Sequence, residues 1–317
     1  MDAIVNNQVD AAFASTISGN ASKIASSPRG IRYPVISHAD KEGWARINKR
    51  APFFVPAMGA EGADKEAIYN HLRSWAVKGF FLAFMLSIVP PGFGDFVAWN
   101  TSELFRNPVA LANYCITFMF VIDVAFATAG YILTFRPLDS HIRTANPYAA
   151  GWMAALICYP PFLLMGDGGP LDYHPGTADW TFWYAGHPWI LGITGAVLVA
   201  LTAIYAWATI AFGIRFSNLT HRGILTHGPY AFSRHPAYLS KNLFWWLSTI
   251  PFLATSSWTD AVRNTVVMAC VSGVYYWRAR TEERHLGADP AYQAYDGWMA
   301  RNGPIPRFFQ RVLRTSR

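Results

Sequence analysis

Residues 188–212 read PWILGITGAVLVALTAIYAWATIAF, a stretch without a charged side chain. An α-helix of this length crosses the roughly 30 Å of hydrocarbon in a lipid bilayer. The composition of the whole chain agrees, because 52% of its 317 residues are hydrophobic and only 14% are charged, whereas charged residues supply about a quarter of a soluble protein. The sequence therefore predicts an integral membrane protein rather than two soluble domains.

Five other segments are apolar over the roughly 17 to 25 residues that a spanning helix needs. Arginine is frequent in the second-to-third loop, the fourth-to-fifth loop and the tail, which by the positive-inside rule places both termini in the cytoplasm. The membrane is expected to be a bacterial inner membrane or the endoplasmic reticulum. We predict an all-α, multi-pass transmembrane bundle of about six spans, near residues 74–91, 108–135, 149–166, 188–212, 239–256 and 261–280.

Several functional classes are excluded by the charged and metal-binding residues. The net charge of +7 is not accompanied by a basic cluster interleaved with aromatic residues on a soluble segment, so we predict no nucleic-acid partner. The nine histidines include no pair three or four residues apart. Di-iron lipid hydroxylases and desaturases need closely spaced histidines, so this class is excluded and no metal is predicted.

Residues 225–242, LTHGPYAFSRHPAYLSKN, place polar side chains at the cytoplasmic end of the predicted fifth span. Pro236 suits the first turn of a helix, where a missing N–H group removes no hydrogen bond. Arg234, His235 and Tyr238 then cluster where the free N–H groups of the helix start point, which is a natural seat for an anion. Alternatively, these side chains bind lipid phosphates at the membrane surface.

Residues 277–295, WRARTEERHLGADPAYQAY, continue the sixth span past the bilayer. Glu282 and Glu283 emerge about one turn beyond the headgroups, where paired carboxylates suit a cationic or hydroxyl-rich ligand. The alternative is a solvated helix face on which Arg278 forms a weak surface pair with Glu282. Asp289 is predicted to cap a short helix that folds the tail back over the mouth of the bundle.

These motifs resemble the membrane family of isoprenylcysteine carboxyl methyltransferases and phospholipid N-methyltransferases. The family pattern runs Gly-Pro-Tyr, Arg-His-Pro-x-Tyr, Glu-Glu-x-x-Leu, tyrosines and a closing Pro-Arg. Upstream of about residue 188 the chain matches no family pattern. In this chain, the counterparts of the family pattern lie within about residues 225–308. They are Gly228-Pro229-Tyr230, Arg234 to Tyr238, Glu282 to Leu286, Tyr292, Tyr295 and Pro306-Arg307.

The resemblance implies an enzyme that moves a methyl group from S-adenosylmethionine to a lipophilic acceptor delivered by the lipid bilayer. The cofactor would occupy a cytoplasmic pocket built by the C-terminal helices. The chain would divide into a partly disordered cytoplasmic arm (1–73), N-terminal transmembrane helices (74–187) and a methyltransferase core with a C-terminal cytoplasmic cap (188–317). The acceptor group is left open among carboxylate, amine, hydroxyl and thiol, and so is the oligomeric state.

The residues of these motifs suit the chemical groups of S-adenosylmethionine. Cationic side chains suit its carboxylate, glutamates suit its ammonium or ribose hydroxyls, and aromatic rings suit its sulfonium and adenine. His235, Glu283 and His285 are candidates for taking a proton, and the sequence does not choose among them. The expected cofactor-binding residues are Gly228, Tyr230, Arg234, His235, Pro236, Tyr238, Glu282, Glu283, Leu286 and Tyr295.

Three polar residues lie inside predicted spans, where inserting an ionisable group costs roughly 2.5 to 3.5 kcal/mol. Asp123 is a further catalytic candidate, in the acceptor pocket, with a hydrogen bond or ion pair between helices as the alternative. Lys241 and Asn242 depart from the small residues that are common in the family at these positions. Lys241 alternatively extends its ammonium to the headgroups.

Two other functions compete with methyl transfer. Membrane sterol reductases bind NADPH and share the Arg-His-Pro-x-Tyr corner, but they usually follow the tyrosine with Gly-Asp. Leu239-Ser240-Lys241 and the twin glutamates favour methyl transfer instead. A non-enzymatic lipid-binding or transport protein is expected to contain broken helices or an inverted repeat at the membrane midplane. Pro160-Pro161 in the third predicted span is the one such break.

Overall fold

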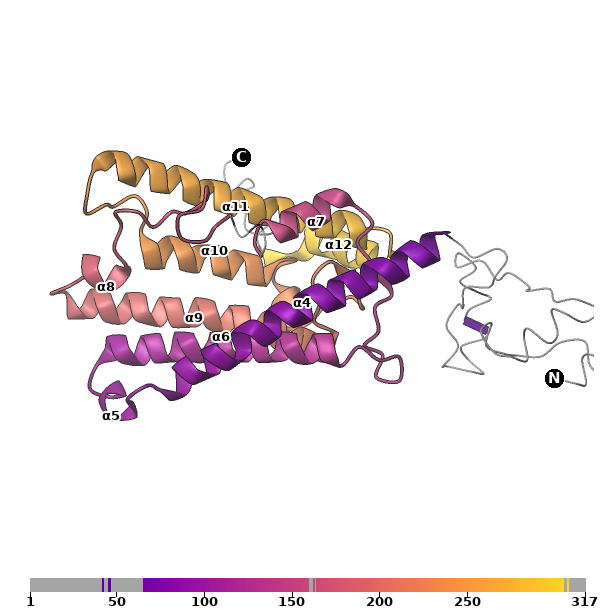
Figure 1. Cartoon of the computed structure of the whole chain (residues 1–317), viewed down its shortest axis with the longest axis horizontal. Coiled ribbons are helices and arrows are strands. Elements are labelled where there is room, and N and C mark those ends of the chain that lie inside the picture. The colour runs from indigo at the N-terminus through magenta and orange to yellow at the C-terminus, as the bar shows by residue number, and fades with distance from the viewer. Residues whose placement is uncertain are drawn as a thin grey trace, which may run out of the picture. The chain divides into compact units, whose positions relative to one another are not determined.

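The chain divides into two compact units, Met1–Leu72 and Arg73–Arg317. In the first unit, the described residues include the beginning of α4 (Lys65–Val97). Most of the arm predicted over residues 1–73 lies outside the described residues, as do Pro160, Pro161 and Pro306. The computed structural model (Figure 1) describes residues 42, 45–46, 65–159, 162, 164–304 and 307.

Apolar helices dominate the described part of the chain. α4, α6 (Pro108–Ile132) and α9 (Pro188–Phe212) are each long and apolar enough to cross a membrane. α6 begins after Asn107, whose side chain accepts hydrogen bonds from the N–H groups of the first turn. The apolar helices predicted at these three places are confirmed.

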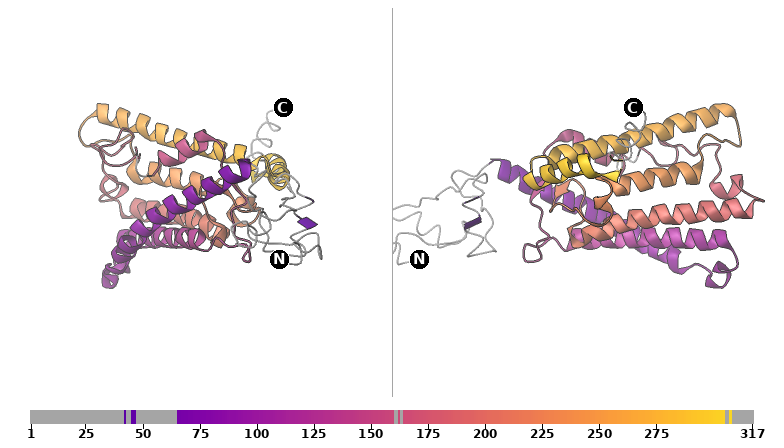
Figure 2. Two further views of the ribbon diagram at one scale, coloured as in Figure 1. Left: turned by 45° about the vertical axis from the view of Figure 1, so that its right-hand side comes forward. Right: turned by 180° about the vertical axis from the view of Figure 1, so that it is seen from behind.

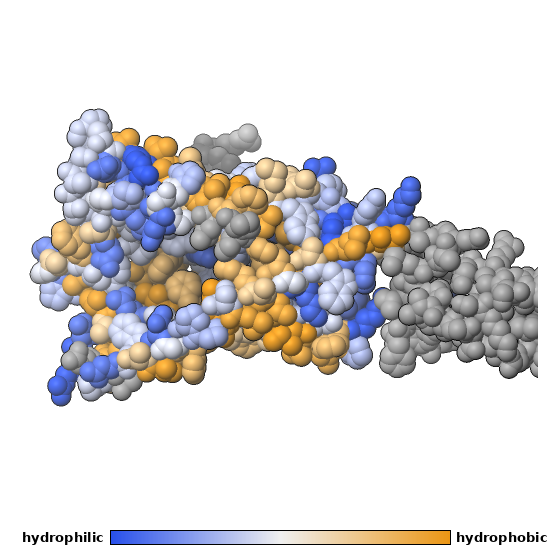
Figure 3. All heavy atoms as spheres, viewed as in Figure 1, coloured by the Kyte–Doolittle hydropathy of each residue, from blue (hydrophilic) through white to orange (hydrophobic). Residues whose placement is uncertain are grey.

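Large apolar side chains stay exposed along these helices instead of filling a core. Phe118 and Phe126 on α6, and Ile193 and Val197 on α9, each expose 39% or more of their surface. Figure 3 shows hydrophobic residues gathered over the middle of the face that α4 and α6 form, with hydrophilic residues towards its two ends. An apolar surface of this extent suits contact with lipid.

The predicted fifth and sixth spans correspond to α10 (Pro236–Thr249) and α11 (Trp258–Leu286). Pro236 occupies the first turn of α10, and the helix ends where Ile250 adopts a left-handed conformation. α10 is therefore about 21 Å long at 1.5 Å per residue. α11 begins after Ser257, whose side chain caps Asp260 N, and it continues past the predicted end at residue 280.

The prediction of a third continuous span over residues 149–166 is wrong. α7 (Ala149–Leu156) ends at Leu156, and the described residues from 157 to 179 form turns and irregular backbone. Two consecutive prolines at 160 and 161 lack the N–H groups that would continue the helix and so favour its end. They are not sufficient alone, because α4 continues through Pro90 and Pro91. α7 contacts α11, and α8 (Trp180–Trp183) precedes α9.

The all-α prediction also needs a small correction. β1 (Thr144–Ala145) and β2 (Thr220–His221) form an antiparallel pair in which Thr144 lies opposite His221. Each strand has two residues, so the fold remains predominantly helical. The pair joins the α6–α7 connection to the α9–α10 connection.

The connections and the C-terminal helix gather at one end of the bundle. Figures 1 and 2 show α6, α9, α10 and α11 side by side, with α5 (Thr101–Leu104) and α8 at the opposite end. Residues 133–148, residues 213–235 and α12 (Pro290–Asn302) lie together at the first end. The motifs selected from the sequence are therefore at the loop-rich end.

One buried arginine holds this end together. Arg222 is 3% exposed and lies in the α9–α10 connection. Its guanidinium donates to the end of α6, to the following loop and to η1 (Gly213–Arg215) with its flanking residue. The accepting carbonyl oxygens belong to Gly130, Leu133, Ser140, Ile214 and Phe216.

Candidate functional site

A cavity lies at the loop-rich end of the bundle. Its wall is formed by the last turns of α9, the 213–235 connection, the first turns of α10, the last turns of α11 and by α12. The cavity therefore lies where the two motif-bearing stretches of the sequence meet. Most of the residues predicted to bind a cofactor line it, namely Tyr230, Arg234, His235, Tyr238, Glu282, Leu286 and Tyr295.

Three of the predicted cofactor-binding residues do not line this cavity. Gly228 has a φ of 60°, a left-handed conformation that favours glycine, and it begins η2 (Gly228–Ala231). Pro236 occupies the first turn of α10, as the sequence predicted. Glu283 is not among the lining residues, but it contacts His235, which is. Gly228 and Pro236 thus shape the backbone around the site.

Glu282 is the one carboxylate among the described residues that line the cavity. Tyr238 donates its hydroxyl hydrogen to Glu282 Oε1. The Nε atom of Arg278 lies 3.6 Å from the same oxygen, and His235 Nδ1 lies 3.9 Å from Oε2. The carboxylate is thereby fixed at the wall by α10 and by its own helix.

Glu283 contacts the other nitrogen of the same imidazole. Successive helical residues point about 100° apart, so Glu283 is turned away from Glu282. Its Oε1 atom lies 3.2 Å from His235 Nε2, and Arg280 forms an ion pair with Oε2. The hydrogen bond with His235 is the main reason that the pKa of Glu283 lies below its usual value. Glu283 orients His235, whose ring stacks on Tyr238.

Arg278 is buried, so its contact with Glu282 is not the weak surface pair given as the alternative. Its side chain is 4% exposed and lines the cavity, and its guanidinium carbon lies 5.2 Å from the centre of the Tyr238 ring. Arg278 also donates to Asn218 Oδ1, and Asn218 donates its backbone N–H to the hydroxyl oxygen of Tyr131, 2.8 Å away. The spacing of four residues from Glu282 signals a shared helix face, but no local signal in the sequence marks Asn218.

α12 folds over the site, in the position expected for the tail. Tyr295 donates its hydroxyl hydrogen to the carbonyl oxygen of Tyr230, 2.7 Å away. Arg234 Nε lies 2.7 Å from Asp296 Oδ1, so this cation is already paired with α12. Arg234 thus joins α12 to the turn before α10, a contact that the sequence did not predict.

His285 lies at the same end, one turn beyond the predicted end of the sixth span at residue 280. It is 8% exposed, it lines the cavity, and its Nε2 atom lies 3.0 Å from Thr144 Oγ1 in β1. Burial lowers the pKa of His285 to about 4, with smaller contributions from the charges of His221 and Arg73. The imidazole is therefore neutral at physiological pH.

We expect the stability of the fold to fall by about 2–3 kcal/mol through His285 as the pH drops from 6.5 to 4. In that window the unfolded chain takes up a proton at His285 and the folded chain does not, so acid favours unfolding. The measurement is the free energy of unfolding of wild type and His285→Gln against pH in detergent micelles. As the pH falls, the free energy of unfolding of the variant should decrease less steeply than that of wild type. Equal slopes for the two proteins would contradict the prediction.

The polar residues inside the helices have separate surroundings. Asp123 is 7% exposed and accepts a hydrogen bond from Thr209, which joins α6 to α9. Thr209 lines the cavity, whereas Asp123 does not. Asn242 donates to the carbonyl oxygen of Tyr238, 2.8 Å away. Lys241 lines the cavity, and its ammonium faces aromatic rings.

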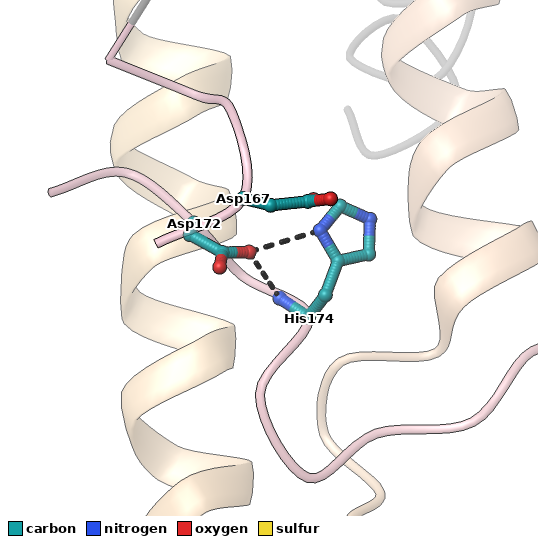
Figure 4. A group of neighbouring side chains, drawn as sticks. All are labelled: Asp167, Asp172 and His174. Carbon is teal, nitrogen blue, oxygen red and sulfur yellow. Dashed lines mark hydrogen bonds and ion pairs between the residues drawn. The ribbon is translucent and has the colours of Figure 1, made fainter. Parts of the chain in front are cut away.

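Another cluster of polar side chains lies in the loop between α7 and α8 (Figure 4). The ligand-type atoms of Asp167, Asp172 and His174 lie within 4.8 Å of one another. Asp172 already accepts hydrogen bonds from the backbone N–H groups of Gly168 and His174, and its Oδ1 atom lies 3.0 Å from His174 Nδ1. These contacts account for the cluster as a structured turn of the loop.

Comparison with known proteins supports the resemblance found in the motifs. Residues 189–288 match the isoprenylcysteine carboxyl methyltransferase family. The match includes α9, α10 and α11, and therefore contains His235, Tyr238, Arg278 and Glu282. No curated protein and no solved structure matches the chain.

Proposed function

We propose that this protein is an integral membrane methyltransferase that uses S-adenosylmethionine to methylate a lipophilic acceptor. The family matched by residues 189–288 is named for methyl transfer to the carboxyl group of isoprenylcysteine. One observation carries the proposal beyond that match: the cavity wall holds a single carboxylate among its described residues, Glu282, fixed by Tyr238 and Arg278. An anionic group in an aromatic wall suits a sulfonium compound.

The described cavity residues fit the chemical groups of S-adenosylmethionine. Glu282 would bind its ammonium or ribose hydroxyls, and the rings of Tyr230, Tyr238 and Tyr275 would face its sulfonium and adenine. The free N–H groups at the start of α10 would receive its carboxylate. Arg234 is a weaker candidate than the sequence suggested, because Asp296 already neutralises it.

When bound, the cofactor supplies an activated methyl group, so the protein mainly has to position the reacting atoms and keep water away. Glu283 and Tyr238 hold His235 at the wall through a contact to Nε2 and a stacked ring. Tyr295 holds α12 over the cavity. Where the acceptor carries a proton, His235 is the proposed proton acceptor, with Glu283 as its orienting partner.

We further propose that the loop-rich end faces the cytoplasm and that the chain crosses the membrane six times. α7 followed by residues 157–179, whose described part forms turns and irregular backbone, would make the third crossing, beside α11. The chain would have a cytoplasmic arm (1–73), N-terminal helices (74–187) and a methyltransferase core (188–317). Both termini would then lie in the cytoplasm.

The proposal is tested by incubating the purified protein with methyl-labelled S-adenosylmethionine and a total membrane lipid extract. We expect a labelled lipid-phase product, which mass spectrometry identifies together with the methylated atom. The matched control is Glu282→Gln, which should give no labelled product. If the wild type binds NADPH and does not bind the methyl donor, the reductase alternative replaces this proposal.

A further inference from the structure

Among the charged side chains of the cavity wall, the cationic ones outnumber Glu282, and one of them differs from the rest. Among the described residues, no carboxylate lies within 4.0 Å of Lys241 Nζ and no hydrogen bond involves this atom. Each arginine of the wall has a polar partner already. The pairs are Arg215 with Asp139, Arg222 with backbone carbonyls, Arg234 with Asp296 and Arg278 with Glu282.

Three aromatic rings surround the Lys241 ammonium. Its Nζ atom lies 5.1 Å from the ring centre of Trp245, 5.2 Å from that of Tyr205 and 5.9 Å from that of Tyr275. These rings stabilise a cation by their negative faces and supply no anion. Asp123 acts on the charge of Lys241 from beyond contact distance, and its carboxylate is bonded to Thr209.

The position of Lys241 along α10 separates it from Glu282, the proposed contact for the ammonium or ribose hydroxyls of the cofactor. It lies five residues after Pro236, about 7 Å along α10 from the helix start. Tyr238, which contacts Glu282, is three residues earlier on the same helix face. A ligand group that meets Lys241 therefore lies deeper in the bundle than one that meets Glu282.

We propose that Lys241 determines acceptor specificity by binding an anionic oxygen, from a carboxylate or an ionised hydroxyl, at the head of an apolar acceptor. The inference rests on the proposed methyltransferase function. A carboxylate would give Lys241 an anion in direct contact, whereas an alkylammonium head would be repelled. The apolar stem of the acceptor would remain in the lipid phase.

An anionic acceptor also simplifies the chemistry. A carbon–oxygen bond forms between the acceptor oxygen and the methyl carbon, the carbon–sulfur bond breaks, and its electron pair stays on sulfur. No proton has to leave an oxygen that is already ionised. Because the ion pair with Lys241 exists before transfer and weakens as the oxygen loses its charge, Lys241 should act on KM and not raise kcat.

The test measures equilibrium binding of chain-matched probes to the full-length protein in detergent. The probes are hexadecanoate, a nitrophenol with a dodecyl chain, hexadecanol and hexadecylamine, at about pH 8, where the nitrophenol is ionised and the amine is cationic. We expect the wild type to bind the two anions about tenfold or more tightly than the alcohol or the amine. Lys241→Met should lose that preference and Lys241→Arg should keep most of it.

Matched controls separate this proposal from the proposed function. Lys78→Met removes a lysine of α4 that does not line the cavity, and it should leave the preference unchanged. Binding of S-adenosylmethionine is measured separately. If the wild type does not bind it, the proposed methyltransferase function is rejected, while the preference for anionic probes is still measured. An unchanged preference in Lys241→Met overturns the proposal. If that variant does not fold, a wild type that binds the amine as well as the anions overturns it.

Discussion

Replacing Glu282 by Gln is expected to weaken binding of S-adenosylmethionine about a hundredfold and to abolish methyl transfer. The substitution keeps the shape of the side chain and removes the one negative charge among the described cavity-lining residues. It also leaves Arg278, which is 4% exposed, without its carboxylate partner. Losing one partner of a hydrogen-bonded charge pair between ligand and protein costs about 2–5 kcal/mol of binding free energy, a range that includes a factor of about a hundred.

The measurement is isothermal titration of the purified variant with the methyl donor, together with its thermal unfolding midpoint in the same detergent. Glu283→Gln is the closest comparison, because it makes the same change one residue along the helix but outside the cavity wall. We expect that variant to lose less than tenfold in affinity. Donor binding by Glu282→Gln within twofold of wild type would remove the main support for the proposed function.

The contact between the two motif-bearing stretches was predictable because both lie at helix ends on the same side of the bundle. His235 precedes the first turn of α10 and Glu282 lies in the last turns of α11, so antiparallel neighbouring helices bring them together. The helical period also separates Glu282 from Glu283, although the sequence alone does not say which of the two faces inward. The roles of these residues in binding and catalysis stay predictions.

Long-range contacts were not predictable from local pattern. Asn218 and Tyr131 are separated by 87 residues, and neither belongs to a motif, yet together they connect α6 to Arg278. The third span was predicted from hydrophobicity, which does not distinguish a continuous helix from a short helix followed by turns. In the sequence, Arg222 is simply one arginine of a basic loop.

That arginine carries the largest expected effect on stability. We expect Arg222→Met to lower the free energy of unfolding by about 3–5 kcal/mol, because its loss leaves several buried carbonyl oxygens without a donor. The guanidinium bonds Gly130 O at 2.9 Å and Ile214 O at 2.7 Å, so one side chain satisfies both the end of α6 and η1. Burial lowers its pKa to about 10, and it remains charged at neutral pH.

The geometry also predicts an order among substitutions. Lysine carries the same charge but has one nitrogen instead of a planar fork, so it cannot reach carbonyls on several sides and Arg222→Lys should lie between wild type and Arg222→Met. Arg143→Met is the matched control, because Arg143 is 39% exposed, and it should change stability by about 0.5 kcal/mol or less. The free energies come from titration with sodium dodecyl sulfate in mixed micelles. If Arg222→Lys has the same free energy of unfolding as wild type, the prediction is wrong. The positive charge, and not the set of hydrogen bonds to carbonyl oxygens, then stabilises this end of the bundle.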